Sequence, residues 1–168
     1  MDIVDTDTRS QMMAGISYKD TRPELLVRRA LHKRGFRFKL HDKELAGKPD
    51  LVFPKYQCVI FVQGCFWHVH DCHLFKWPKT REQFWHEKLG KNQLRDARNL
   101  SELKRSGWRT ALVWECALRG ISPEKKTHVI DQLNAWIING GEFLSIEGND
   151  LANADDMDTD SYDVDIFG

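Results

Sequence analysis

A short segment of the chain concentrates residue types that bind metal ions. Residues 64–78 read GCFWHVHDCHLFKWP and contain two cysteines and three histidines. Within the segment, Cys65, His70 and Cys72 form the pattern C-x4-H-x-C, and the expected fold brings Cys116 toward them. Three thiolates and one imidazole suit tetrahedral zinc. Because four protein ligands leave no open position for a substrate, we predict that this zinc is structural.

Other interpretations of the same residues stay open at this point. The cysteines can be buried apolar thiols beside surface histidines. His68 and His73 are rival ligands within the same loop. Cys58 lies in the middle of an apolar run, so we expect it in the core and not in a metal site.

Two acids and one histidine could carry hydrolytic chemistry. Asp50 follows Pro49 at the head of an expected strand, where a carboxylate can bind Mg²⁺ if the edge of the sheet is open. The alternative is an ordinary aspartate at the start of a strand. Glu24 is equally explained as a capping-box acid three residues after Thr21. His68 has the alternative of an ordinary loop histidine.

Aromatic residues in and beside this polar loop suggest contact with nucleic acid. Phe66 and Trp67, with Trp77 and Trp85 nearby, could insert between base pairs, or they could fold inward as a core beneath the loop. The helix that follows carries basic residues that either contact phosphates or are simply solvated: Arg81, Lys88, Lys91, Arg95 and Arg98.

The hydrophobic pattern predicts the elements that position these residues. They are, in chain order, a helix over 20–35 capped by Thr21, strands over 36–40, 50–53 and 57–62, a helix over 80–107 capped by Thr80, a strand over 109–114, and a helix over 122–139. This order of elements predicts an α/β fold.

The predicted topology brings the chemical groups together. Strands 57–62 and 109–114 are joined by a long helix, so we expect them to be parallel, with Cys65 and Cys116 at the same edge. Strands 50–53 and 57–62 are joined by a tight turn, so we expect an antiparallel pair that places Asp50 beside residues 60–62. Asp50, Val62, the cysteine-rich loop and Cys116 should therefore converge.

The charge of the chain is unevenly distributed. The 168 residues have a formal net charge of zero, but residues 145–168 contain eight acids and no Lys or Arg. Subtracting these acids leaves 25 basic and 17 acidic groups in residues 1–144, a net charge of +8. We predict one basic domain over 1–144, suited to a polyanionic partner, and an acidic, flexible tail over 145–168. We expect a cytoplasmic protein with reduced thiols, because neither a secretory signal nor a membrane-spanning run is visible.

Several longer segments resemble a known family. The segments TRSQMMAGI, GKPDLVF, CVIFVQGCFWHVHDCHLFKWP, FWHEKLGKNQLRD and GWRTALVWECALRG resemble, in order, the very short patch repair mismatch endonucleases, and the resemblance runs over about residues 7–120. It implies a fold like that of type II restriction endonucleases, with a mixed sheet flanked by helices and a structural zinc loop. It implies a bacterial, nucleoid-associated enzyme that nicks double-stranded DNA 5′ of the thymine in a T·G mismatch, such as deamination of 5-methylcytosine produces. Action as a monomer and coupling to mismatch repair proteins are further expectations.

The resemblance also implies roles for individual residues. Asp50 matches the Mg²⁺-binding aspartate, and the main-chain carbonyl of Val62 a second Mg²⁺ ligand. His68 matches the catalytic histidine, Glu24 an acid that supports the attacking water, and Asp96 a further acid near the site. The structural zinc ligands match Cys65, His70, Cys72 and Cys116. The aromatic and apolar residues that enter the duplex match Phe66, Trp67 and Trp85 on one side and Met13 on the other, and positions that read DNA match Lys88 and Asn92.

One departure from the usual nuclease pattern bears on mechanism. A PD-(D/E)XK site needs a second acid and a lysine on the strand after Asp50, and QCVIFVQG has neither. The carbonyl of Val62 can still bind Mg²⁺ whatever its side chain, and His68 can replace the lysine in proton transfer. Two rival functions are a zinc-stabilised DNA-binding module without catalysis and a zinc-dependent hydrolase. The acids argue against the first and the three cysteines against the second.

Overall fold

A five-stranded mixed sheet forms the centre of the protein. The computed structural model describes residues 19–148. The strands lie in sequence order across the sheet: β1 Lys39–Leu40, β2 Leu51–Phe53, β3 Cys58–Gln63, β4 Arg109–Trp114 and β5 Phe143–Ile146. The first three strands pair antiparallel, and β3, β4 and β5 pair parallel. The predicted α/β class and the orientations of the two central pairs are confirmed.

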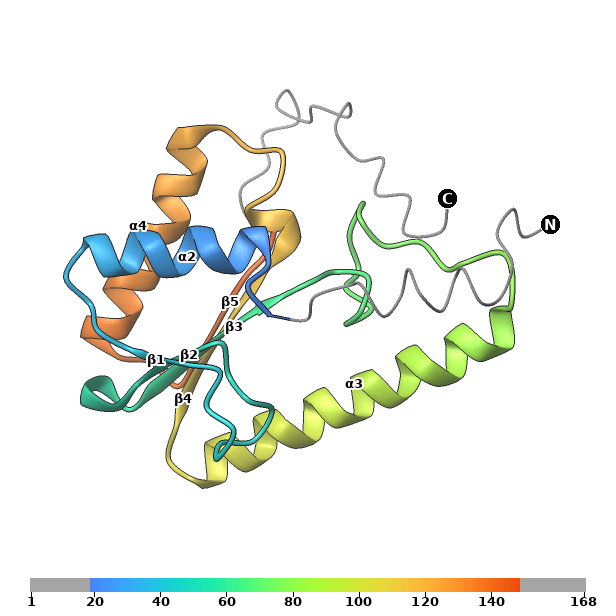
Figure 1. Cartoon of the computed structure of the whole chain (residues 1–168), viewed down its shortest axis with the longest axis horizontal. Helices are drawn as coiled ribbons and strands as arrows, with labels where there is room; N and C mark the ends of the chain where they lie inside the picture. Colours follow the sequence, from blue (N-terminus) through green and yellow to red (C-terminus); the bar gives the residue numbers. More distant parts are fainter. Residues whose placement is uncertain (1–18, 149–168) are drawn as a thin grey trace.

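Within residues 19–148, three helices cover the two faces of the sheet. They are α2 Arg22–Lys33, α3 Glu82–Arg105 and α4 Pro123–Asn139, with short 3-10 turns at Pro54–Tyr56 and Glu115–Ala117. Helices α2 and α4 pack on one face, and α3 lies along the other (Figure 1). Because β3 is covered on both faces, it is apolar at almost every position. None of the helices in the part of the chain described is long and apolar enough to cross a membrane.

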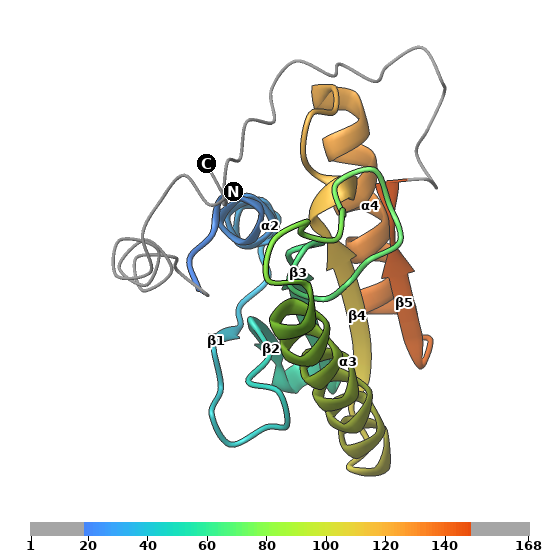
Figure 2. The same cartoon turned by 90° about the vertical axis from the view of Figure 1, so that its right-hand side faces the viewer.

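The parallel crossover sets the position of both centres described below. Val62 pairs with Val113, and Gln63 pairs with Trp114 at the ends of their strands. The segments that follow, which contain Cys65 and Cys116, therefore leave the sheet from the same edge. In Figures 1 and 2 the loop of residues 64–81 then passes over the N-terminal half of α3, which extends beyond the sheet.

Local signals predicted some element boundaries and missed others. Thr21 caps α2 as expected, accepting a hydrogen bond from the main-chain N of Glu24 at 3.4 Å. The expected cap at Thr80 is wrong, because α3 begins after Arg81, which adopts a left-handed conformation and makes no side-chain cap bond. The strand expected over 36–40 is reduced to two residues, because the main-chain N of Phe36 donates to the carbonyl of Leu31 in α2 at 3.2 Å and not to β2. The Phe36 ring packs into the core.

The last strand was not predicted. Residues Phe143–Ile146 form β5, and Ile146 is buried against the main core. Their alternating pattern is too short to stand out beside the acidic residues that follow. The sheet therefore continues past residue 144, where the sequence placed the end of the folded domain. Residues 149–168 of the predicted tail lie outside the described part.

Candidate active site and metal centre

Asp50 lies where the antiparallel pair predicts. It precedes β2, and its Oδ2 accepts a hydrogen bond from the main-chain N of Val62 at 2.7 Å. The Asp50 side chain is 16% exposed, so one edge of the carboxylate remains open to a ligand. The expected convergence of Asp50 with the end of β3 is confirmed.

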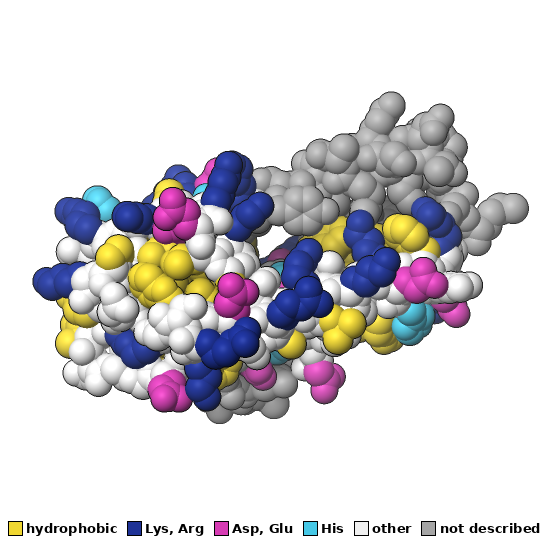
Figure 3. All heavy atoms as spheres, turned by 90° about the horizontal axis from the view of Figure 1, so that it is seen from below, with side chains coloured by type: hydrophobic (Ala, Val, Ile, Leu, Met, Phe, Trp, Pro, Cys, Tyr) yellow, Lys and Arg dark blue, Asp and Glu magenta, His cyan; other side chains and the backbone are white. Residues whose placement is uncertain are grey.

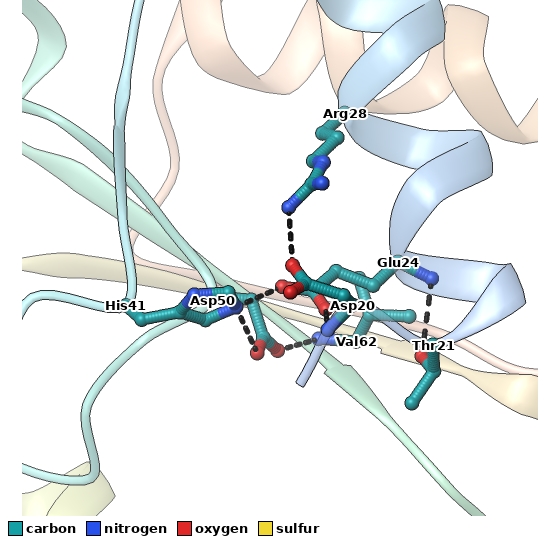
Figure 4. Close-up of polar contacts among 7 residues, drawn as sticks. All are labelled: Asp20, Thr21, Glu24, Arg28, His41, Asp50 and Val62. Carbon is teal, nitrogen blue, oxygen red and sulfur yellow. Dashed lines mark hydrogen bonds and ion pairs between the residues drawn. The ribbon is translucent and has the colours of Figure 1, made fainter. Parts of the chain in front are cut away.

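His41, which the sequence analysis did not single out, lies between Glu24 and Asp50. Glu24 is 1% exposed, and its carboxylate accepts from the main-chain N of Asp20 and pairs with Nε2 of His41 (Figure 4). The same Nε2 lies 3.8 Å from Oδ1 of Asp50. The Glu24 carboxylate therefore does not complete a capping box with Thr21, and it connects the first turn of α2 to the acid that precedes β2.

The pairing register of β1 with β2 shows why His41 lies beside Asp50. Leu40 pairs with Leu51, so the next position on each strand places His41 opposite Asp50. The main-chain N of His41 donates to the carbonyl of Asp50 at 3.1 Å. Because β1 has only two residues, no hydrophobic period revealed that pairing in the sequence.

Burial makes the ionised form of Asp50 costly. Desolvation raises the pKa of Asp50 from 3.8 to about 7, and the nearby carboxylate of Glu24 adds to the rise. The hydrogen bond from Val62 and the charge of His41 oppose it. Two buried carboxylates at one point favour a positive charge between them. Hard carboxylate oxygens are the donors that Mg²⁺ prefers, so Asp50 and Glu24 fit that ion.

His68 and Asp96 form the second part of the site. Nδ1 of His68 lies 2.5 Å from Oδ2 of Asp96, which extends from α3. With Nδ1 engaged by the carboxylate, Nε2 is the ring nitrogen available for proton transfer. His68, Asp96, Asp50 and Val62 all line one cavity of about 800 Å³. The basic residues that line the same cavity are Lys19, Lys43, Lys48 and Arg95.

The predicted cysteine–histidine set comes together in space. The ligand atoms of all four residues, Cys65, His70, Cys72 and Cys116, lie within 4.8 Å of one another. Sγ of Cys116 is 3.5 Å from Nδ1 of His70, and the His70 ring stacks on Trp114 at 4.0 Å between centroids. Three thiols and one imidazole at this spacing can hold a soft or borderline metal ion with no open position. Cys58 is buried in the main core, as expected.

Two residues of the supposed tail support this cluster. The main-chain N of Gly148 donates to Sγ of Cys116 at 3.2 Å, and Oε1 of Glu147 lies 3.5 Å from Nε2 of His70. The Cys65 thiol, followed by the Gly148 N–H, lowers the pKa of Cys116 to about 6, although burial opposes the shift. A carboxylate behind a ligating imidazole fixes its tautomer and orientation. The sequence did not predict either contact, because acidic composition concealed the last strand.

Two of the aromatic residues in and beside the loop fold inward, which is one of the two alternatives that the sequence left open. Phe66 and Trp85 are 8% and 1% exposed and pack with Leu89 in a third, separate cluster. Trp67 is half-buried against the same cluster, 5.1 Å from the ring of Phe66 between centroids. The inward-folding alternative therefore describes Phe66 and Trp85 in this conformation. Met13 lies outside the described residues.

The two predicted DNA-reading residues have contacts within the protein. Nδ2 of Asn92 donates to the main-chain carbonyl of Trp67 at 3.2 Å, so Asn92 holds the loop. Nζ of Lys88 lies 5.9 Å from the ring centroid of Phe84. Many Lys and Arg side chains, with some Asp and Glu among them, lie on the face viewed from the α3 side (Figure 3). The exposed basic residues on or next to α3 include Arg81, Lys91, Arg95 and Arg98.

Comparison with known proteins shows the family to which this chain belongs. Residues 1–74 match the family model described as DNA mismatch endonuclease Vsr. The chain is 44% identical over 146 residues to the DNA mismatch endonuclease Vsr of Escherichia coli K12, which covers 87% of this chain and 94% of that protein. The chain therefore belongs to the Vsr family of DNA mismatch endonucleases.

Nicking enzymes of other bacteria are also similar. Identity is 45% to the type II nicking enzyme V.XorIIP of Xanthomonas oryzae pv. oryzae, over 70% of this chain and 86% of that protein. Identity is 46% to the type II nicking enzyme V.NmeAIP of Neisseria meningitidis, over 70% of this chain and 84% of that protein.

Replacing Gly148 should weaken metal binding by the cysteine–histidine cluster. A Cβ at this position would lie 2.6 Å from the carbonyl oxygen of Cys116, so Gly148→Ala must displace the chain that donates to the Cys116 thiolate. We expect about a tenfold loss of Zn²⁺ affinity, typical of a lost outer contact. Chelator competition measures it. Gly90→Ala is the control, because nothing lies near its Cβ. Equal affinity in the two variants would contradict the role of Gly148.

Asp50→Asn should stabilise the protein in the absence of Mg²⁺, and more so at high pH. Between pH 3.8 and about 7 the unfolded chain releases a proton that the folded protein retains on Asp50. The stability of the unsubstituted protein therefore falls as pH rises through this window. The gain from Asn should be larger at pH 8 than at pH 5 by roughly 2 to 3 kcal/mol. Urea unfolding of the zinc-loaded protein measures it, and a pH-independent gain would contradict the assignment.

Proposed function

We propose that this protein is a Mg²⁺-dependent endonuclease that nicks one strand of duplex DNA 5′ of the thymine in a T·G mismatch. The observation that carries the proposal is the convergence of Asp50 and the His68–Asp96 pair on one cavity lined by lysines, with the buried Glu24 joined to it through His41. Membership of a mismatch endonuclease family, with nicking enzymes among the relatives, supports the reaction. The T·G preference and the position of the cut follow from the sequence resemblance described above.

Different residues around the cavity would bind the metal ion, bind phosphate and transfer a proton. Asp50 and the main-chain carbonyl of Val62 would hold Mg²⁺, which supplies a Lewis acid for the scissile phosphate, and Glu24 would support the attacking water. The lysines of the cavity attract and orient the phosphate backbone. His68 accepts or donates a proton at Nε2, because Asp96 holds its other nitrogen.

The cysteine–histidine cluster would serve structure and not catalysis. We infer that Cys65, His70, Cys72 and Cys116 hold Zn²⁺ with four protein ligands, which leaves no site for substrate. The segment from Cys65 to Cys72 includes Phe66, Trp67 and His68. One metal ion bound by ligands from both ends of that segment would therefore fix the position of the catalytic histidine relative to Asp50.

Mismatch recognition would use the aromatic cluster. We infer that Trp67, Phe66 and Trp85 enter the duplex from one side and Met13 from the other, because a mismatched step costs less to open than a paired one. Phe66 and Trp85 are buried, so their insertion requires this small cluster to open. Lys88 would contact DNA directly, and Asn92 would act partly by holding the Trp67 carbonyl.

Further expectations of the family concern fold and cell biology. The antiparallel β2–β3 pair beside a parallel β4 supports a restriction-endonuclease-like fold. We infer action as a monomer in the bacterial cytoplasm, at the nucleoid, with coupling to mismatch repair proteins. The rival function is a zinc-stabilised DNA-binding module without catalysis, and the nicking assay below separates the two.

Asp50→Ala should abolish nicking while mismatch binding is kept. Phosphate contacts and stacking supply most of the affinity, so the loss should fall on the rate, by at least about a thousandfold. His68→Ala should be nearly as damaging. A single-turnover assay with Mg²⁺ on duplexes with each mismatch, in several sequence contexts, measures the rates and the preference for T·G. Asp71→Ala, which removes an exposed acid of the same loop, is the control. A binder that never nicks T·G duplexes would establish the rival.

Trp67→Ala should reduce discrimination between T·G and paired DNA more than it reduces nonspecific binding. Stacking of an aromatic side chain on a base is worth roughly 1–3 kcal/mol, so discrimination should fall by about tenfold to a hundredfold. Competition binding measures both affinities. Trp77→Ala is the matched control, because Trp77 lies in the same loop and stacks on His86 at 4.0 Å between centroids. Unchanged discrimination would assign Trp67 to the core alone.

A further inference from the structure

His41 occupies the point where the two buried acids of the active site meet. Its Nε2 pairs with Oε1 of Glu24 and lies 3.8 Å from Oδ1 of Asp50 (Figure 4). Glu24 comes from α2, and Asp50 immediately precedes β2. The imidazole is 22% exposed, so it lies in the wall of the cavity and not on the open surface.

The backbone holds His41 in this position. Its φ is +48°, a left-handed conformation that is uncommon for residues other than glycine. Its main-chain N donates to the Asp50 carbonyl at 3.1 Å. Conformations of this kind persist where the surrounding structure fixes them, and they cluster at ligand sites. The position of the imidazole is therefore set by the same strand pairing that sets Asp50.

A nearby third acid is already neutralised. Asp20, Glu24 and His41 also have ligand atoms within 4.8 Å of one another. However, Oδ1 of Asp20 lies 2.7 Å from the guanidinium of Arg28, and Asp20 is largely exposed. Asp50 has no such cationic partner among the described residues other than His41. The imidazole therefore groups with Asp50 and Glu24.

We propose that His41 contributes a nitrogen ligand to the divalent-cation site of Asp50 and Glu24, and that it shifts the preference of this site from Mg²⁺ toward Mn²⁺. The inference rests on the proposed function. Ligand atoms of one six-coordinate ion lie roughly 3 to 4 Å apart, and the separation of Nε2 from Oδ1 of Asp50 is 3.8 Å. His41 also compensates for the second acid that QCVIFVQG lacks.

The choice of metal follows from the chemistry of the donors. Carboxylate oxygens suit both Mg²⁺ and Mn²⁺, but Mn²⁺ is a first-row transition ion and accepts an imidazole nitrogen more readily than the harder Mg²⁺ does. Replacing the imidazole by an amide keeps a polar side chain that can donate to Glu24 but removes the nitrogen ligand. His41→Gln should therefore weaken Mn²⁺ binding by about tenfold. Mg²⁺ binding should change by less than about threefold.

Pulsed electron paramagnetic resonance on the zinc-loaded full chain with one equivalent of Mn²⁺ tests the proposal directly. The unsubstituted protein should show a coupling from a directly bound ¹⁴N. His41→Gln should lose that coupling, and His68→Gln should keep it. His128→Gln, which removes an exposed histidine of α4, is the control for both coupling and affinity. Titration calorimetry supplies the Mn²⁺ and Mg²⁺ affinities of each variant.

The possible failures are distinguishable. If Asp50→Ala removes Mn²⁺ binding but the unsubstituted protein shows no ¹⁴N coupling, the cation site stands and the role of His41 is overturned. The same holds if His41→Gln retains the coupling. If Asp50→Ala leaves Mn²⁺ binding unchanged, the cation lies elsewhere, and the proposed function fails together with this inference.

Discussion

The pairing of β3 on both of its edges is the constraint on which both centres depend. The antiparallel partner β2 brings the Asp50 carboxylate to the main-chain N of Val62. The parallel partner β4 brings Cys116 to Cys65, only three residues beyond Val62. A shift of β3 by one residue would turn its side chains to the opposite faces and separate both sets of groups. The apolar residues that bury β3 on both faces thus also secure the chemistry at its end.

The parts of the fold that the sequence predicted are those with long, strong patterns. Two apolar runs joined by a long amphipathic helix have few possible arrangements, so the meeting of Asp50 with Val62 and of Cys65 with Cys116 followed from connection rules. Short elements gave no such signal. His41 depends on a two-residue strand whose register only the folded sheet defines.

Tertiary contacts also overrode local signals at the C-terminal side. Gly148 approaches Cys116 because β5 pairs with β4, yet its neighbours in the sequence are mostly polar or acidic. Composition alone therefore assigned to a tail a segment that supports the cysteine–histidine cluster. In the same way, Thr80 had the residue type of a helix cap, but the left-handed turn at Arg81 delayed the start of α3.

The candidate active site and the aromatic cluster make opposite demands on stability. Asp50 and Glu24 are held close together, so their ionised forms are costly, and a bound cation would offset that cost. The Phe66–Trp85–Leu89 cluster, in contrast, buries apolar surface worth about 2 kcal/mol for each large side chain. Insertion into DNA would forfeit that burial and replace it with stacking of similar size. Because the cluster lies apart from the two cores of the sheet, and the cysteine–histidine set anchors both ends of the 65–72 segment, such an opening can stay local while Asp50 and His68 keep their places.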